Sequence, residues 1–171
     1  MNIIVTEYDE KWPLQFKEEA TKLKMIYGAE ILEIHHIGST SVPGMIAKPV
    51  IDIMPVVRDI RKVDAYNEQM IELGYEPLGE NGIKQRRFFR KGRVHRTHHV
   101  HIFQFNNHLD IDRHVAVRCY LQQFPEVARL YGALKAKLAK EFPLDRVAYI
   151  EGKDHFVTEL EKKALKWYRT L

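Results

Sequence analysis

The sequence is poor in cysteine, since Cys119 is the single cysteine among 171 residues. One cysteine cannot form an intramolecular disulfide, which argues against a small disulfide-stabilised secreted scaffold. Glycine and proline are also scarce, at 9 and 7 residues, and hydrophobic residues make up 45%, which excludes collagen-like and low-complexity chains. The chain should fold around a hydrophobic core, and its length predicts a single domain over residues 1–171.

Long apolar runs are missing as well. The first residues, MNIIVTEYDEKW, bring in an acidic side chain by position 7 and contain no long apolar segment. Neither a secretion signal nor a membrane span is therefore indicated. We expect a cytoplasmic protein with no membrane partner.

Acidic side chains are absent from Asn81 to Leu109, within a chain whose net charge is +4. The basic residues and histidines of this stretch are Lys84, Arg86, Arg87, Arg90, Lys91, Arg93, His95, Arg96, His98, His99, His101 and His108. Two interpretations remain open: a phosphate-binding surface, or a hairpin whose basic faces meet only water. Nucleic acid is a poor candidate partner, because the net charge is small and no nucleic-acid-binding motif is present.

Hydrophobic spacing predicts a mixed α and β first half and a helical remainder. Strands are expected over residues 3–6, 31–38, 49–57, 75–79, 86–91 and 98–105. Helices are expected from an N-cap at Asp9 to Gly28, where the first should end, and over 59–73. Helical spacing continues over residues 111–124, 127–141 and 146–168. Because no Gly/Ser/Pro linker separates the halves, we predict an α+β fold in which a mixed sheet packs with helices and the C-terminal portion is helical.

The segment IHHIGSTSVPGMIAKPVIDIMP places a Gly/Ser turn between two predicted strands. Asp52 interrupts the apolar run of the second strand, where an isolated charge is costly unless it is paired or binds a metal. Asp52 therefore either meets a cation or lies at the edge or end of the sheet. Gly38 permits close backbone approach, and Ser39, Thr40 and Ser41 offer hydroxyls and amides for phosphate, although an ordinary turn uses the same residues.

Three histidines follow in the segment HHVH. Strand alternation places His99 and His101 on one face and His98 on the other. With Asp52 they would form a set of two histidines and one carboxylate, which binds zinc or manganese and leaves positions open for water or substrate. This pattern indicates a histidine-metal-dependent hydrolase as one alternative, and hydrogen-bonded packing or surface histidines as another.

The sequence resembles the GrpB family over nearly the whole chain. The resemblance rests on HIGSTSVPG at His36 to Gly44, AKP at Ala47 to Pro49, Asp52, and RTHHVH at Arg96 to His101. The later residues that also fit are Arg118, Tyr120, Leu121, Pro125, Tyr131, Lys135, Phe142, Tyr149 and Lys153.

The GrpB family is similar to the nucleotidyltransferase superfamily, whose pattern is a Gly-Ser turn after one strand and an acid-x-acid pair on the next. The resemblance implies a metal-dependent nucleotidyltransferase, with Asp52 as the catalytic residue, bound to magnesium or manganese, and a hydroxyl acceptor attacking the α-phosphate of a nucleotide. The implied phosphate-binding residues are Gly38, Ser39, Thr40, Ser41, Lys48, Arg87, Arg90 and Lys153.

The sequence departs from the superfamily pattern at the second acid, where Met54 offers a thioether that is a poor magnesium ligand. The neighbouring strand over 98–105 contains no acid, so His99, His101 or Gln104 would have to complete the site. A non-catalytic module that binds a nucleotide or a coenzyme-A-related ligand is therefore a further alternative. Some relatives in the family are joined to dephospho-CoA kinase, which implies coenzyme A chemistry as a partner class.

Overall fold

The computed structural model describes residues 2–171, which form two compact units that alternate along the chain. The sheet unit comprises residues 11–37 and 50–111, and the helical unit comprises residues up to 10, 38–49 and 112–171.

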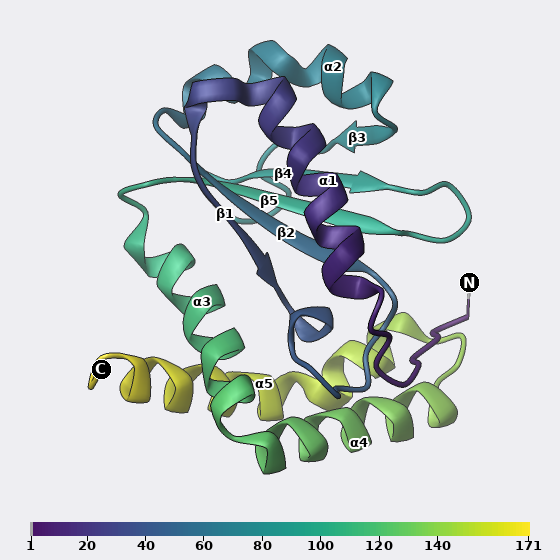
Figure 1. Ribbon diagram of the computed structural model, residues 1–171. Coiled ribbons are helices and arrows are strands. Elements are labelled where there is room, and N and C mark those ends of the chain that lie inside the picture. Colours follow the sequence, from purple (N-terminus) through teal and green to yellow (C-terminus); the bar gives the residue numbers. More distant parts are fainter. Residues whose placement is uncertain (1) are drawn as a thin grey trace. The chain divides into compact units, whose positions relative to one another are not determined.

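The sheet unit contains one mixed sheet with the strand order β1-β2-β5-β4-β3 (Figure 1). Its strands are β1 (Ile31–Ile37), β2 (Ile51–Val57), β3 (Tyr75–Pro77), β4 (Arg87–Lys91) and β5 (His98–Gln104). β2 and β5 are parallel, and the other three pairings are antiparallel. The predicted mixed sheet is confirmed.

Two α-helices belong to the sheet unit, α1 (Trp12–Tyr27) and α2 (Asn67–Glu72). The N-cap predicted at Asp9 is wrong, because α1 begins after Lys11 and has no side-chain capping bond. The helix predicted from Asp59 to Leu73 is only partly α-helical, because residues Ile60–Tyr66 form a 3-10 helix before α2 begins. The Asp59 side chain accepts a hydrogen bond from the backbone N–H of Arg61, two residues later. This local bond begins a tighter turn than an α-helix.

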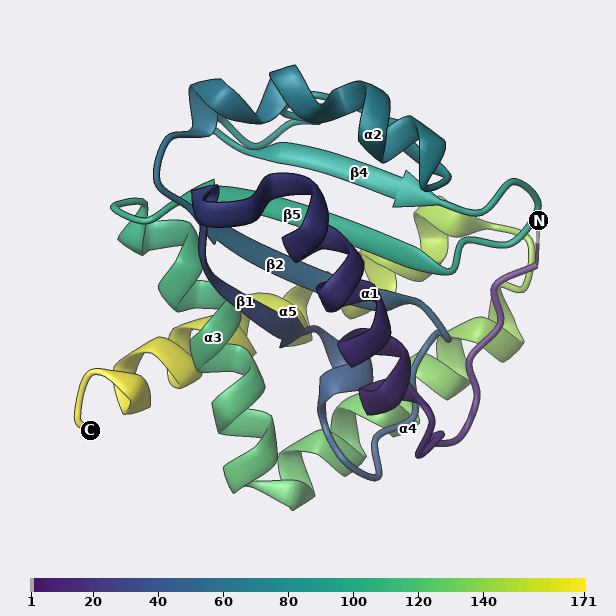
Figure 2. The same ribbon diagram turned by 45° about the horizontal axis from the view of Figure 1, so that its top comes forward.

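One face of the sheet is covered by α1, which crosses over β1 and β2 (Figures 1 and 2). Phe16 of α1 stacks on the His36 ring of β1, with ring centroids 4.8 Å apart. Next to His36 on this face, three buried side chains lie side by side on the neighbouring strands. They are Ile53, Val100 and Phe89, each at most 1% exposed. Burial of this row contributes to the hydrophobic core on the covered face.

A buried carboxylate, Glu19, ties α1 to the same face of the sheet. It accepts hydrogen bonds from the Tyr75 hydroxyl at 2.8 Å and from Lys91 Nζ at 2.5 Å, and His98 Nε2 lies 3.9 Å away. Burial raises the pKa of Glu19, but the bonds from Lys91 and Tyr75 outweigh burial and hold this pKa below its usual value. Burial is also the main cause of the lowered pKa of His98. No motif in the sequence predicts this network.

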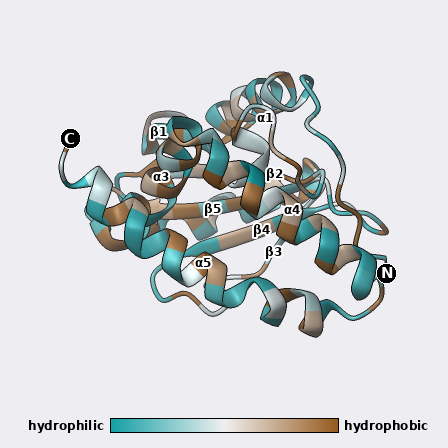
Figure 3. Cartoon of the chain, turned by 90° about the horizontal axis from the view of Figure 1, so that it is seen from below, coloured by the Kyte–Doolittle hydropathy of each residue, from teal (hydrophilic) through white to brown (hydrophobic). Residues whose placement is uncertain are grey.

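The helical unit is formed by α3 (His108–Gln123) from Asp112 onward, α4 (Pro125–Glu141) and α5 (Arg146–Tyr168). Hydrophobic and hydrophilic residues alternate along α4 and α5 in Figure 3, as expected for amphipathic helices. Its core contains Val42, Met45, Leu121, Ala128, Tyr131 and Leu160. The predicted helical C-terminal portion is confirmed. Within residues 2–171, no helix combines the length and apolar character needed to cross a membrane.

The strand predicted over residues 3–6 is not formed. Thr6 makes an isolated bridge to Ala47, and in the part of the chain that the structure describes this segment joins no longer ladder. Ile3 and Val5 instead pack against a buried cluster of the helical unit that includes Leu138. The apolar residues are partly buried, but without a partner strand their β-propensity cannot produce a sheet.

We expect Glu19→Gln to destabilise the protein by about 3 kcal/mol, because Lys91 would lose its partner carboxylate in a buried setting. Wild-type stability should also fall between about pH 7 and pH 4, since both lowered pKa values mean that the unfolded chain binds more protons there. The Glu19 contribution is lost as the pH falls below about 4.3, so the variant should lack that part of the decline.

Urea denaturation at several pH values measures both effects. Glu18→Gln, an exposed neighbour in α1, is the control and should change stability by less than about 0.5 kcal/mol. Equal destabilisation by the two substitutions would show that the network does not stabilise the fold.

Candidate functional site

Asp52 lies on an interior strand of the sheet and not on an edge strand. It is the second residue of β2 and is paired with Ile37 of β1 on one side and with His99 of β5 on the other. Because Ile53 belongs to the face covered by α1, alternation places Asp52 on the opposite face. Its side chain is 27% exposed. The edge-strand alternative is therefore excluded, whereas the alternative of a strand end is confirmed, because Asp52 is one residue from the start of β2.

Two histidines of β5 lie beside the Asp52 carboxylate. His101 Nε2 lies 3.0 Å from Asp52 Oδ1 and His99 Nδ1 lies 3.6 Å from the same oxygen. His98 contacts Glu19 on the other face, so the predicted split of the three histidines is confirmed. Burial raises the pKa of Asp52, but the hydrogen bond from His101 and the approach of His99 outweigh burial and hold this pKa well below its usual range. Asp52 is therefore ionised at neutral pH.

A buried arginine, Arg86, approaches the far side of His101. Its Nη1 lies 3.4 Å from His101 Nδ1, and it also donates to the backbone carbonyls of Glu80 and Asn81. A guanidinium can only donate, so His101 Nδ1 accepts, and a neutral ring then carries its proton on Nε2 toward Asp52. Arg86 was expected only as part of the basic stretch. The sequence contains no signal that this arginine, 6% exposed, is buried while its neighbours are not.

The donor groups around Asp52 are of the types that bind a divalent transition metal. Two imidazoles and one carboxylate suit zinc or manganese better than magnesium, which prefers oxygen ligands. Among residues 2–171, however, no three His, Cys, Asp or Glu side chains are already arranged to hold a metal ion. The hydrogen bond between His101 Nε2 and Asp52 Oδ1 occupies the atoms that would bind a metal. A cation here would therefore have to displace the proton that these two atoms share. Met54, fully buried, supplies no second carboxylate.

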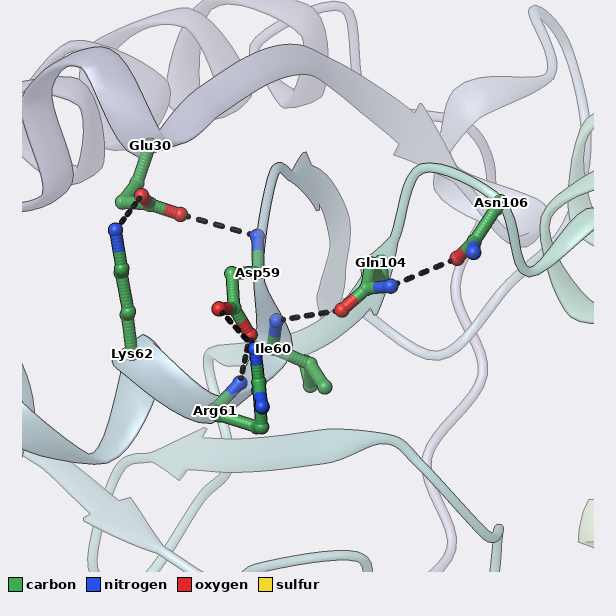
Figure 4. Close-up of polar contacts among 7 residues, drawn as sticks. All are labelled: Glu30, Asp59, Ile60, Arg61, Lys62, Gln104 and Asn106. Atoms are coloured by element: carbon green, nitrogen blue, oxygen red, sulfur yellow. Dashed lines mark hydrogen bonds and ion pairs between the residues drawn. The ribbon is translucent and has the colours of Figure 1, made fainter.

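Gln104, the third polar candidate on β5, is engaged elsewhere (Figure 4). Its side-chain oxygen accepts a hydrogen bond from the Ile60 N–H at 3.1 Å, and its amide nitrogen donates to Asn106 at 2.9 Å. Alternation places Gln104 on the face opposite His101. It therefore stabilises the start of the 3-10 helix and does not contribute to the Asp52 cluster.

The two arginines of β4 that were predicted to bind phosphate lie on opposite faces of the sheet. Arg87 lies on the α1 face, where its Nε is 2.9 Å from Asp64 Oδ1. Arg90 is paired in register with His99, on the face of the Asp52 cluster, and its Nε is 2.7 Å from Glu76 Oε2. The sheet therefore separates Arg87 from the cluster, whereas Arg90 shares its face.

The Gly-Ser turn belongs to the helical unit. Gly38 has φ 72°, a conformation that favours glycine, and Ser39–Ser41 form a single turn of 3-10 helix. Ser41 Oγ donates to the Gly38 carbonyl at 2.5 Å, and Gln122 of α3 donates to the Ser41 carbonyl at 3.0 Å. Thr40 is buried. The turn is therefore held in one conformation by local bonds and by α3.

A buried lysine of α4, Lys135, contacts this turn. Its Nζ donates to Ser39 Oγ at 2.8 Å and lies 4.6 Å from the centre of the Tyr131 ring, while the residue is only 3% exposed. Lys135 was identified only as a residue that fits the family and not as a site residue. Its position four residues after Tyr131 on the apolar face of α4 is the signal that could have identified it.

Lys48 and Lys153, which were predicted from different parts of the chain, converge on one aromatic ring. Their Nζ atoms lie 6.0 Å and 5.3 Å from the centre of the buried Tyr149 ring. Lys48 is exposed and Lys153 is half-buried. The helical unit thus brings both lysines together beside a surface that favours cations.

The chain matches a known protein family over most of its length. The profile of the family described as GrpB protein matches residues 2–163. The UPF0157 protein YqkA of Bacillus subtilis (strain 168) is 48% identical over 160 residues, which cover 94% of this chain and 46% of YqkA. This chain therefore spans about half the length of that relative. The crystal structure of the conserved protein GrpB from Enterococcus faecalis is similar with a TM-score of 0.94 and 48% identity, covering 96% of this chain and 99% of that one.

A more distant likeness concerns the fold alone. A solved structure of a cytoplasmic RNA terminal U-transferase matches with a TM-score of 0.53 and 16% identity, over 78% of this chain and 42% of that one. This match confirms the predicted nucleotidyltransferase-like α+β fold. The extent of the family match and the relatives' identity show that the chain belongs to the GrpB family.

Proposed function

We propose that this chain binds a nucleotide or a similar phosphorylated small molecule together with a divalent cation. The observation that carries the proposal is Asp52, an ionised carboxylate in a central strand with two imidazoles at its Oδ1 atom. A carboxylate and imidazoles are the groups that hold zinc or manganese, and a bound phosphate or water can complete the coordination.

The Gly-Ser turn supplies an independent argument for an anionic ligand. Lys135 brings a buried ammonium to the hydroxyl of Ser39, and the turn is fixed by bonds to Gly38 and Gln122. A rigid turn with hydroxyls and a nearby cation is suited to phosphate oxygens. We assign phosphate binding to Gly38, Ser39, Thr40, Ser41 and Lys135.

Nucleotidyl transfer is the reaction that we propose for this ligand, by analogy with the U-transferase that shares the fold. An acceptor hydroxyl would attack the α-phosphorus of a nucleoside triphosphate and lose its proton to solvent. The bond from this phosphorus to the bridging oxygen would break, and pyrophosphate would leave. A bound cation would offset the charge of the phosphates. Because Met54 replaces the second carboxylate, the chain offers one carboxylate, Asp52, for this purpose.

Asp52→Ala should abolish the metal-dependent part of nucleotide binding, because it removes the charge that holds the cation. The measurement is a thermal-shift series with ATP, CTP, GTP, UTP and coenzyme A, each with magnesium, manganese or a chelator. A ligand at about 100 times its dissociation constant adds roughly 2.7 kcal/mol to the stability of the wild type. A nucleotide that shifts the melting temperature would then be tested for pyrophosphate release.

The matched control for Asp52→Ala is Asp154→Asn, which removes one negative charge from an exposed position on α5. It should retain the full metal-dependent shift. A wild-type protein that shows no shift with any nucleotide, or an Asp52→Ala variant that binds as the wild type does, would refute the proposal.

Lys135→Met should weaken nucleotide binding by roughly tenfold or more, because a charge-assisted contact to phosphate is lost. Binding should remain dependent on the metal, since Asp52 is unchanged. Titration calorimetry measures the affinity, with Lys137→Met as the control because Lys137 is exposed on the same helix. Unchanged affinity in Lys135→Met would exclude the Gly-Ser turn as the phosphate site.

A histidine-metal hydrolase is the second candidate, favoured by the approach of His99 and His101 to one carboxylate oxygen. In that case purified protein should retain zinc or manganese, and it should hydrolyse a phosphodiester such as bis(p-nitrophenyl) phosphate. His99→Ala should remove both the metal, measured by elemental analysis, and the activity. Metal retained by His99→Ala at the wild-type level would contradict this candidate.

A further inference from the structure

We propose that an arginine-lined cavity at the β3–β4 edge of the sheet unit binds the dianionic phosphate group of a small phosphate monoester. This arginine cavity has a volume of about 380 Å³, and its charged lining consists of Arg90, Arg93, Arg96 and Glu76. The proposal goes beyond the proposed function, since it requires neither Asp52 nor a metal ion.

The charge of the arginine cavity matches a dianion. Three guanidinium groups face a single carboxylate, which leaves an excess of two positive charges. A phosphate monoester carries about −1.5 to −2 at neutral pH and accepts hydrogen bonds from several guanidinium groups, whereas a carboxylate would neutralise only half of the excess. The β4–β5 hairpin that carries these arginines adds no negative charge of its own, because the sequence has no Asp or Glu from Asn81 to Leu109.

The hairpin that carries these arginines is held in a defined conformation. Gly92 has φ 105°, and a Cβ atom at this position would lie 2.1 Å from the His95 carbonyl oxygen, so the turn requires glycine. Arg96 Nη1 donates to the Gly92 carbonyl, and the Thr97 N–H donates to the Lys91 carbonyl at 2.9 Å. Bonds within the turn thus hold Arg96 at the cavity before any ligand arrives, which lowers the entropic cost of binding.

The two other arginines differ in how they are engaged. Arg90 is held by Glu76, with Nε 2.7 Å and Nη2 3.3 Å from the two carboxylate oxygens. Arg93 is exposed, and within residues 2–171 no carboxylate lies within ion-pair distance of it. Arg93 can therefore turn toward a ligand without breaking an ion pair. Arg90, for which phosphate binding was predicted, would have to exchange Glu76 for the phosphate group of the ligand.

The test is titration calorimetry with methyl phosphate in the presence of a chelator. We expect saturable binding to the wild type, about tenfold weaker binding to Arg93→Ala, and tighter binding to Glu76→Gln, because Arg90 is then released. In parallel, the Nε–Hε resonances of the cavity arginines in the wild-type protein should shift on titration, which reports binding at these side chains independently of any variant.

Lys84→Ala is the matched control, since it removes one exposed positive charge from the same acid-free stretch outside the cavity, and it should bind as the wild type does. Equal weakening in Lys84→Ala and Arg93→Ala would reduce the effect to general surface charge and overturn the proposal. Absence of saturable binding, or acetate binding as tightly as methyl phosphate, would also overturn it.

The failure of this proposal is distinguishable from failure of the proposed function. Asp52→Ala should bind methyl phosphate as the wild type does, and loss of that binding in Asp52→Ala would refute the cavity as the site. Conversely, a protein that shows no metal-dependent nucleotide shift but binds methyl phosphate in the chelator would retain this inference and lose the other.

Discussion

The ionised carboxylate of Asp52 in a central strand is the constraint on which the site depends. A partly buried charge is tolerated when polar groups replace its hydration. His101 supplies a hydrogen bond from the adjacent parallel strand, and the His99 ring lies close to the same oxygen. Arg86 donates to Nδ1 of His101, so that the Nε2 proton of His101 points to Asp52. Because each group orients the next, the cluster behaves as one unit, and a cation or phosphate that binds there must exchange with these bonds.

The sheet of this protein separates two kinds of polar chemistry. On the face covered by α1, Glu19 is almost fully buried and bonded to Tyr75 and Lys91, an arrangement that secures a helix to a sheet. On the opposite face Asp52 is partly exposed, and its partners are imidazoles that can exchange a proton for a metal. Both carboxylates have a lowered pKa for related reasons, yet exposure to solvent makes only the second a candidate site.

The basic stretch from Asn81 to Leu109 does not act as one surface. Strand alternation and local partners divide it: Arg87 pairs with Asp64 on one face, Arg86 is buried against His101, and Arg93 reaches the cavity at the sheet edge. A run of like charge in a sequence is thus divided among separate surroundings, because neighbouring residues of a strand point in opposite directions.

The sequence by itself determined the mixed sheet, its helical C-terminal portion, and the placement of His99 and His101 on one strand face with His98 on the other. These follow from hydrophobic period and from strand alternation. The tertiary structure alone decided which distant residues meet: Arg86 with His101, Lys135 with Ser39, and Glu19 with Lys91. Such partners depend on strand order and helix packing, which local spacing does not encode. For the same reason the apolar segment over residues 3–6 packs among helices and not as a strand, since a strand requires a neighbour that the fold does not provide.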